Sequence, residues 1–319
     1  MDLKLKTLDM KYLAIIFSLV IGLSASEVSA QDYLFRVLAN KPGTNQVKKA
    51  GSSTAVQLKT GSKLYSGDQI IASQGAYIGL VYKTGKTIEI KTAGVHNVDN
   101  LVSKVNKGTA GVTGRYMNFV MNKMNESDGD VNKNYRRNLN ATGAVSRATG
   151  MYGLALLMKD AKSPNKIYGD KAILRWEGGE EEDTYLVSVK NAFSEVLYEV
   201  ESNENKIELD FTSDKLKAEK FLIVAVMSTS SESLKSQDYG IQRLNPSETE
   251  ELKSNLAELE KEMVEGSSLN SLMYASFYEE NGLYLDALTK YEAAVNENPE
   301  IEDFQAIYDQ FIEANGLGN

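Results

Sequence analysis

The 319-residue sequence contains no cysteine and a single histidine. Without cysteine, the chain cannot form disulfides, thiolate metal sites or a cysteine nucleophile. His96 lies in the stretch AGVHNVDN, which we interpret as a loop, and no histidine–acid dyad can be nominated. Ser–Lys and paired-carboxylate chemistry stay open, but no set of acid, base and nucleophile stands out. We therefore expect a protein that is not an enzyme and that has no catalytic residues, cofactor or metal.

Long apolar runs are also scarce. Three lysines precede one uncharged apolar run of twelve residues at 12–23, and the segment ends in EVSA before Gln31. Spanning a bilayer takes about twenty apolar residues, so a retained anchor is the less favoured alternative. A basic leader, a short apolar stretch and small residues at the end are typical of a secretory signal peptide. We predict a signal peptide over 1–30, cleaved between Ala30 and Gln31, and no transmembrane segment afterwards.

The tripeptide Gly-Lys-Thr at 85–87 occurs in phosphate-binding loops, but its surroundings differ from such a loop. A P-loop has four residues between its glycines, whereas five separate Gly79 from Gly85. Residues 86–91 alternate between polar and apolar, which is a strand pattern rather than the helix that follows a P-loop. We interpret Thr84-Gly85 as a hairpin turn and not as a nucleotide site.

Charge is unevenly distributed along a chain whose net charge is −9. Residues 104–149 contain eight basic and three acidic residues, whereas 245–319 contain seventeen acidic and three basic ones. The acidic C-terminal segment argues against nucleic acid as a partner. It favours a positively charged partner or the chain's own middle region, unless these charges only solvate helix surfaces.

Residues 31–104 show short alternating runs separated by glycine-containing turns, which predicts a small all-β sandwich or barrel. The run LKTGSKLYSGDQIIAS, followed by AYIGLVYKTGKTIEI, resembles the FecR-type β domain, with a Leu-x-x-Gly-Asp-x-Ile turn before a strand and a glycine hairpin after it. The positions that carry this resemblance are Leu64, Gly67, Asp68, Ile70, Leu80, Gly85, Ile88 and Ile90. The resemblance implies a domain outside the cytoplasm of a bacterium. Because the eleven residues before the apolar run cannot form a regulatory domain, the family's signalling role is not implied.

Residues 105–165 are expected to be a partly helical connecting region. Tyr116, Phe119, Val120 and Met124 recur at helical spacing and predict a buried helix. The stretch DGDVNKNYRRNL begins like a calcium-binding loop, but Lys133 and Leu139 occupy the positions that require glycine and glutamate. We interpret it as a polar connecting loop, in which paired arginines are exposed or bind an anion.

Residues 166–244 return to alternation, with five or more short strands, and resemble an immunoglobulin-like or fibronectin-like sandwich. Trp176 is then expected to anchor the core rather than to stack on a ligand. The acidic run at 180–183 lies between two strands and is interpreted as a solvated turn.

Residues 245–319 are predicted to be helical, starting at Asn245-Pro246. Within them, 268–301 is similar to one tetratricopeptide (TPR) repeat: small residues stand where two antiparallel helices touch, aromatic residues fill between them and a proline ends the second helix. The matching residues are Ala275, Tyr278, Gly282, Tyr284, Ala287, Tyr291, Ala294 and Pro299. The resemblance implies a protein-binding surface. Since about three repeats are usually needed for stability, the alternative is a module that caps or docks onto the β domains.

Together these patterns predict a multidomain α+β protein with a FecR-like β domain, a middle Ig-like sandwich and C-terminal TPR-like hairpins. We expect a non-enzymatic exported adaptor or scaffold, most simply periplasmic but otherwise secreted or envelope-associated, that binds an unidentified protein partner through its TPR-like module. The alternative is a protein that binds a glycan or another cell-envelope polymer through its β domains. An adaptor should expose an apolar patch on the helical module. A glycan binder should expose a row of aromatic side chains on a β face.

Overall fold

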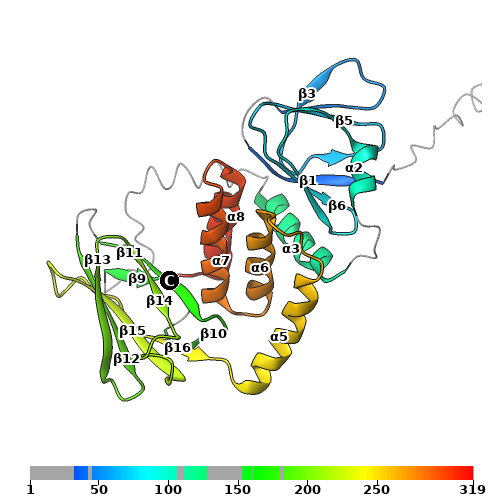
Figure 1. Cartoon of the computed structure of the whole chain (residues 1–319). Helices are drawn as coiled ribbons and strands as arrows, with labels where there is room; N and C mark the ends of the chain where they lie inside the picture. Colours follow the sequence, from blue (N-terminus) through cyan, green and yellow to red (C-terminus); the bar gives the residue numbers. More distant parts are fainter. Residues whose placement is uncertain are drawn as a thin grey trace, which may run out of the picture. The chain divides into compact units, whose positions relative to one another are not determined.

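The computed structural model describes residues 32–41, 45–105, 111–127, 153–159, 161–179 and 183–318. The predicted signal peptide with Ala30 and Gln31, the calcium-like stretch, its paired arginines and the acidic residues 180–182 lie outside them, as does the side chain of Met124. Residues Tyr33–Asn319 form one compact unit of mixed α+β structure. Its sheets lie in about the first three quarters of the chain and its helices mostly after them (Figure 1).

The first β unit consists of two four-stranded sheets that share one hydrophobic core. One sheet has the order β4-β1-β6-β7, from Lys63–Leu64, Phe35–Asn40, Ile78–Tyr82 and Thr87–Ile90. The other has the order β3-β2-β5-β8, from Ala55–Gln57, Gln46–Lys48, Gln69–Ala72 and Gly94–Asn97. The expectation of an all-β segment is wrong in one respect, because helix α2 (Val98–Lys104) follows β8 and adds Val98 and Leu101 to this core. The side chain of Asn97 caps α2 by accepting a hydrogen bond from the backbone N–H of Asp99.

The Gly-Lys-Thr tripeptide lies in the hairpin between β6 and β7, as predicted. The backbone N–H of Tyr82 donates to the carbonyl of Lys86, and that of Gly85 donates to the carbonyl of Tyr82. Gly85 has φ +90°, so this three-residue loop ends in the left-handed position that glycine occupies without strain. A strand and not a helix follows, which removes the geometry of a phosphate-binding loop.

The second β unit packs a five-stranded sheet against a three-stranded one. The larger sheet has the order β10-β16-β15-β12-β13, from Asn165–Ile167, Tyr239–Arg243, Phe221–Ser228, Tyr185–Asn191 and Val196–Ser202. The smaller has the order β14-β11-β9, from Lys206–Asp210, Lys171–Gly178 and Leu154–Leu156. Trp176 is fully buried in the shared core and stands edge-on to Tyr185, with ring centroids 5.5 Å apart, which confirms its predicted role as a core anchor. Since β9 and β10 belong to these sheets, the pairing begins before residue 166.

The C-terminal residues form four helices, α5 (Pro246–Glu260), α6 (Leu269–Glu280), α7 (Tyr284–Glu297) and α8 (Glu302–Asn315). The predicted helix start is confirmed: the Asn245 side chain accepts from the backbone N–H of Glu248, whose carboxylate accepts from the backbone N–H of Asn245. Gly316 ends α8 with φ +58°.

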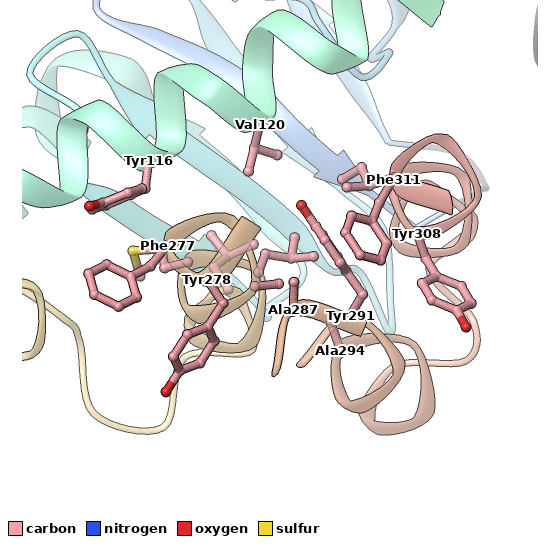
Figure 2. Packing of buried hydrophobic residues seen from close by; sticks show 14 of the residues in the cluster. Tyr116, Val120, Phe277, Tyr278, Ala287, Tyr291, Ala294, Tyr308 and Phe311 are labelled. Carbon is pink, nitrogen blue, oxygen red and sulfur yellow. The ribbon is translucent and has the colours of Figure 1, made fainter. Parts of the chain in front are cut away.

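Helix α3 (Val112–Ser127) belongs to the same helical layer, although it precedes the second β unit in sequence. Tyr116, Met117, Val120 and Met121 of α3 share one core with the buried side chains of α5 to α8. Figure 2 shows side chains from α3, α6, α7 and α8 meeting in this cluster. The cluster also includes Leu38, Tyr77 and Val81 of the first β unit. Thus the segment predicted as a connecting region contributes a core helix.

Candidate functional site

The α6–α7 hairpin contains the eight residues that carry the TPR resemblance. Five of them are buried between helices, namely Ala275, Tyr278, Ala287, Tyr291 and Ala294. Gly282 turns the chain between the helices with φ +72°, Tyr284 begins α7 with a partly buried ring, and Pro299 lies exposed in the turn after α7. The structure therefore brings the hairpin residues together as packing residues.

A buried polar network crosses this hairpin. The hydroxyl of Tyr291 donates to Oε2 of Glu279 (2.8 Å), and Nδ2 of Asn315 donates to Oε1 of the same carboxylate (2.6 Å). Burial, with the nearby Glu279 charge, raises the pKa of Tyr291 well above its ordinary value, so the hydroxyl keeps its proton and stays a donor. The network connects α6, α7 and α8, and it has no signature in the sequence apart from the helical spacing.

Three polar side chains on one face of α7 dock this helix onto the second β unit. Asp286 accepts hydrogen bonds from the backbone N–H groups of Tyr168 (3.0 Å) and Gly169 (2.7 Å). Thr289 accepts from the backbone N–H of Ile173 (3.0 Å). Residues three apart lie on the same side of a helix, so this face of α7 follows the edge of the β unit.

The third member of this face is Glu292, which pairs with Arg175 of β11. Nε of Arg175 donates to Oε1 (2.5 Å) and Nη2 donates to Oε2 (3.2 Å), while the hydroxyl of Tyr308 also donates to Oε1 (3.0 Å). Such a bidentate pair fixes the orientation of the two side chains as well as their distance.

Burial raises the pKa of Asp286 to about 6, against the lowering effect of its two backbone N–H donors.

Carboxylates also join the helices to the first β unit. Asp303 of α8 accepts from the backbone N–H of Asn40 (3.0 Å) and the hydroxyl of Thr60 (2.7 Å). Glu89 of β7 accepts from the hydroxyl of Tyr77 (2.7 Å) and the backbone N–H of Ser268 (2.9 Å), just before α6. At each of these contacts several hydrogen-bond donors satisfy one carboxylate. Hydrogen bonds therefore connect the helical layer to both β units.

The helical layer consequently offers little open apolar surface. Across the described ranges, the large apolar side chains that stay exposed are Val56, Val95, Phe193, Val196 and Val264. None of these lies in a helix, and only one is aromatic. The exposed apolar patch expected on the helical module, and the aromatic row expected on a β face, are both missing from this part of the chain.

A groove of about 670 Å³ lies beside β7. Its walls come from Lys86–Thr92, from the end of α2 and from residues 261–264, which follow α5. Lysines 86, 91, 104 and 261 and His96 line it together with Glu89 and Glu262. His96 lies in β8 and not in a loop, and its Nε2 is 2.9 Å from the carbonyl oxygen of Thr92. No local pattern in the sequence indicates this groove, because its walls come from segments up to about 180 residues apart.

Among the described residues, no group of three or more His, Asp or Glu side chains is placed to hold a metal ion. Nor does any helix in those ranges have the length and apolar character needed to cross a membrane. Comparison with known proteins found no matching family model and no matching curated protein.

Proposed function

We propose that the chain is a non-enzymatic exported scaffold that binds a protein partner, in which the helical layer joins two β units and the β units carry the binding surface. One observation carries this proposal: α7 contributes Asp286, Thr289 and Glu292 to the second β unit, while α8 contributes Asp303 to the first. Helices held on two sides by satisfied carboxylates are suited to fixing the geometry of their neighbours.

This proposal moves the binding surface away from the TPR-like hairpin. TPR surfaces bind through open helical faces, whereas α6 and α7 here bury most of their side chains. Of the two roles expected for the hairpin, docking onto the β units is therefore favoured over peptide capture. The eight hairpin residues would then be structural.

The finer fold assignments belong to the same proposal. The turn that carries the FecR resemblance is built around Asp68, which is buried and accepts from the backbone N–H groups of Ala50 and Tyr65 and from Nζ of Lys49. Gly67 beside it has φ +83°. This turn supports a FecR-like first unit. The two packed sheets around Trp176 support an Ig-like second unit, and Gly282 with its flanking alanines supports a TPR-like hairpin.

The alternative function, binding of an envelope polymer, receives less support. Glycan sites commonly present aromatic rings to sugar faces, and Phe193 is the one aromatic among the large apolar side chains exposed in the described ranges. The apolar patch expected of an adaptor is missing from the described residues as well, so the docking contacts of the helical layer are what favour a protein partner.

Export and partner binding are tested separately. Fusing residues 1–40 to an alkaline phosphatase that lacks its own leader should give active enzyme outside the cytoplasm. The Ala30→Arg variant should block cleavage before Gln31, as read by N-terminal sequencing. An inactive fusion would contradict export.

Partner binding is tested with the intact chain, because removing residues after 245 would expose the core of the helical layer. The full-length protein should recover one protein reproducibly from envelope extract, read by mass spectrometry. The recovery should survive surface substitutions on α5 such as Lys253→Glu. If repeated experiments recover no protein, that result would contradict the proposal of an adaptor or scaffold.

A further inference from the structure

Strand β7 is an edge strand, and its free side faces the groove described above. In the sheet order β4-β1-β6-β7, β7 pairs with β6 alone among the described residues. Tyr82 and Lys86 form a hydrogen-bonded pair, and such pairs alternate along an antiparallel ladder. The backbone N–H and C=O groups of Thr87 and Glu89 therefore point away from β6, and no hydrogen bond from the described part of the chain reaches them on that side.

The groove has the shape of a slot for another strand. Seven consecutive residues, Lys86–Thr92, form one wall, so the groove runs along the whole of β7. Leu101 and Val105, which are almost entirely buried in the core of the first β unit, lie behind one side of the groove, and Met263 with the half-exposed Val264 lines the other side. Because side chains of a strand alternate between two faces, an added strand would contact both sides of the groove.

The charge of the groove is positive. Lysines 86, 104 and 261 line it without an ion-pair partner in the described ranges, and Lys91 is paired with Glu89. The two carboxylates that line it are already engaged, Glu89 by Tyr77 and Ser268 and Glu262 by the backbone N–H of Val112. Three lysines, which come from the β6–β7 hairpin, the end of α2 and the turn after α5, favour a ligand with several negative charges along its length.

We propose that this groove binds an extended acidic segment of the partner protein, which adds to β7 as a fifth strand of the sheet. The inference rests on the proposed function, since it locates the surface through which the scaffold binds. Exposed strand edges recognise polypeptide through main-chain hydrogen bonds, with side-chain contacts supplying selectivity. A nucleic acid or glycan is disfavoured because no Phe, Tyr or Trp lines the groove to stack on a base or sugar.

The test uses the full mature chain and a fluorescein-labelled peptide of alternating Glu and Val, seven residues long. We expect fluorescence anisotropy to show saturable binding that weakens as salt is raised. The same peptide with Lys in place of Glu should not bind. A version with N-methylated backbone nitrogens should lose binding, because it cannot pair with a strand edge. Amide hydrogen exchange at Thr87 and Glu89 should slow when the acidic peptide is present.

Reversing the charge of lysines in the groove distinguishes binding at this site from non-specific electrostatic attraction to the protein. The exposed lysines allow a double variant, Lys104→Glu with Lys261→Glu, that removes no buried contact, and we expect it to weaken binding about tenfold or more. The matched control is Lys253→Glu on α5, which is exposed and outside the groove, and it should bind like the unchanged protein.

Equal binding by both variants, equal binding of acidic and basic peptides, or unaltered exchange at Thr87 and Glu89 would each overturn the proposal. Concentration-dependent self-association that the double variant abolishes would make a second copy of this chain the occupant, and would also overturn it. Failure here is distinct from failure of the scaffold function. If the intact chain and the double variant recover the same partner from extract, the scaffold stands and the groove is not its binding site.

Discussion

Gly85 and Gly114 lie against each other where the tip of the β6–β7 hairpin meets the first turn of α3. A methyl group on Gly85 would overlap the backbone of Gly114, and one on Gly114 would press on the carbonyl oxygen of Thr84. Two features therefore require glycine at position 85. One is its φ of +90°, and the other is the close approach of α3. At this point backbone atoms of the helical layer and of the first β unit approach each other closely.

This contact predicts the effect of Gly85→Ala. Positive φ alone should reduce the free energy of unfolding by about 1 kcal/mol, and the overlap with Gly114 should raise the loss to at least ~2 kcal/mol. Gly51→Ala is the matched control, because Gly51 has φ +75° but nothing within 4 Å of the added methyl group. Urea unfolding of both variants measures the difference. Equal losses would contradict the contact with α3.

The buried carboxyl of Asp286 predicts a pH dependence. Its pKa is about 6 in the folded protein and 3.8 ordinarily, so the folded state holds this proton more tightly. The stabilisation from this group is therefore complete below about pH 3.8 and is lost as the pH rises through about 6, a change of roughly 3 kcal/mol. Asp286→Asn should remove this part of the slope in urea unfolding between pH 4 and 7. Lys290 is the charged neighbour that opposes the raised pKa.

The exposed Asp238→Asn provides the control for that experiment, and it should leave the slope unchanged. A wild-type profile parallel to that of Asp286→Asn would contradict the assignment. Direct titration of the Asp286 carboxyl carbon by NMR would report the same pKa without unfolding.

The pair of Arg175 and Glu292 predicts strong coupling between α7 and β11. Glu292→Ala leaves Arg175 and the hydroxyl of Tyr308 without their acceptor, so it should cost about 3 kcal/mol of stability. Replacing both partners, as in Arg175→Met with Glu292→Ala, should cost clearly less than the losses of Arg175→Met and Glu292→Ala added together. A double-mutant cycle with thermal unfolding measures this coupling. Additive losses would show that the ion pair is not what joins these elements.

Asp68 predicts a loss confined to the first β unit. Asn at this position keeps one acceptor oxygen, but its NH₂ group would face the donors Tyr65 N–H and Lys49 Nζ. Asp68→Asn should therefore reduce the free energy of unfolding by about 2 kcal/mol. Faster hydrogen exchange of the amide of Tyr65, with that of Ala50 less affected, would place the loss at this turn. Unchanged exchange there would contradict the role assigned to the carboxylate.

Local signals in the sequence predicted local structure well. The hairpin at Gly85, the start of α5 at Asn245-Pro246 and the burial of Trp176 depend on turn chemistry, capping and side-chain size. These effects act over a few residues, so a single sequence contains enough information to predict them.

The docking surfaces were not predictable, because they pair residues that are distant in sequence. The alternation in 86–91 does not reveal that the polar Thr87 is buried, which follows from the packing of distant helices against Val81, its neighbour on β6. In the sequence, Asp286 has the features of an ordinary surface residue of a helix. In the structure, its carboxylate accepts hydrogen bonds from the backbone N–H groups of Tyr168 and Gly169. The candidate groove likewise required three separate segments to be brought together.

The position of α3 has a consequence for the order in which the protein can fold. Its apolar residues Tyr116, Met117, Val120 and Met121 meet α6, which is made about 150 residues later, and α8, which is made about 190 residues later. Contacts between residues so far apart in sequence form late. Apolar surface that stays exposed until they form promotes aggregation. In a chain that stops before α6, this helix would lack the helices that cover its apolar side. The core around α3 can therefore form only after the C-terminal helices have been synthesised.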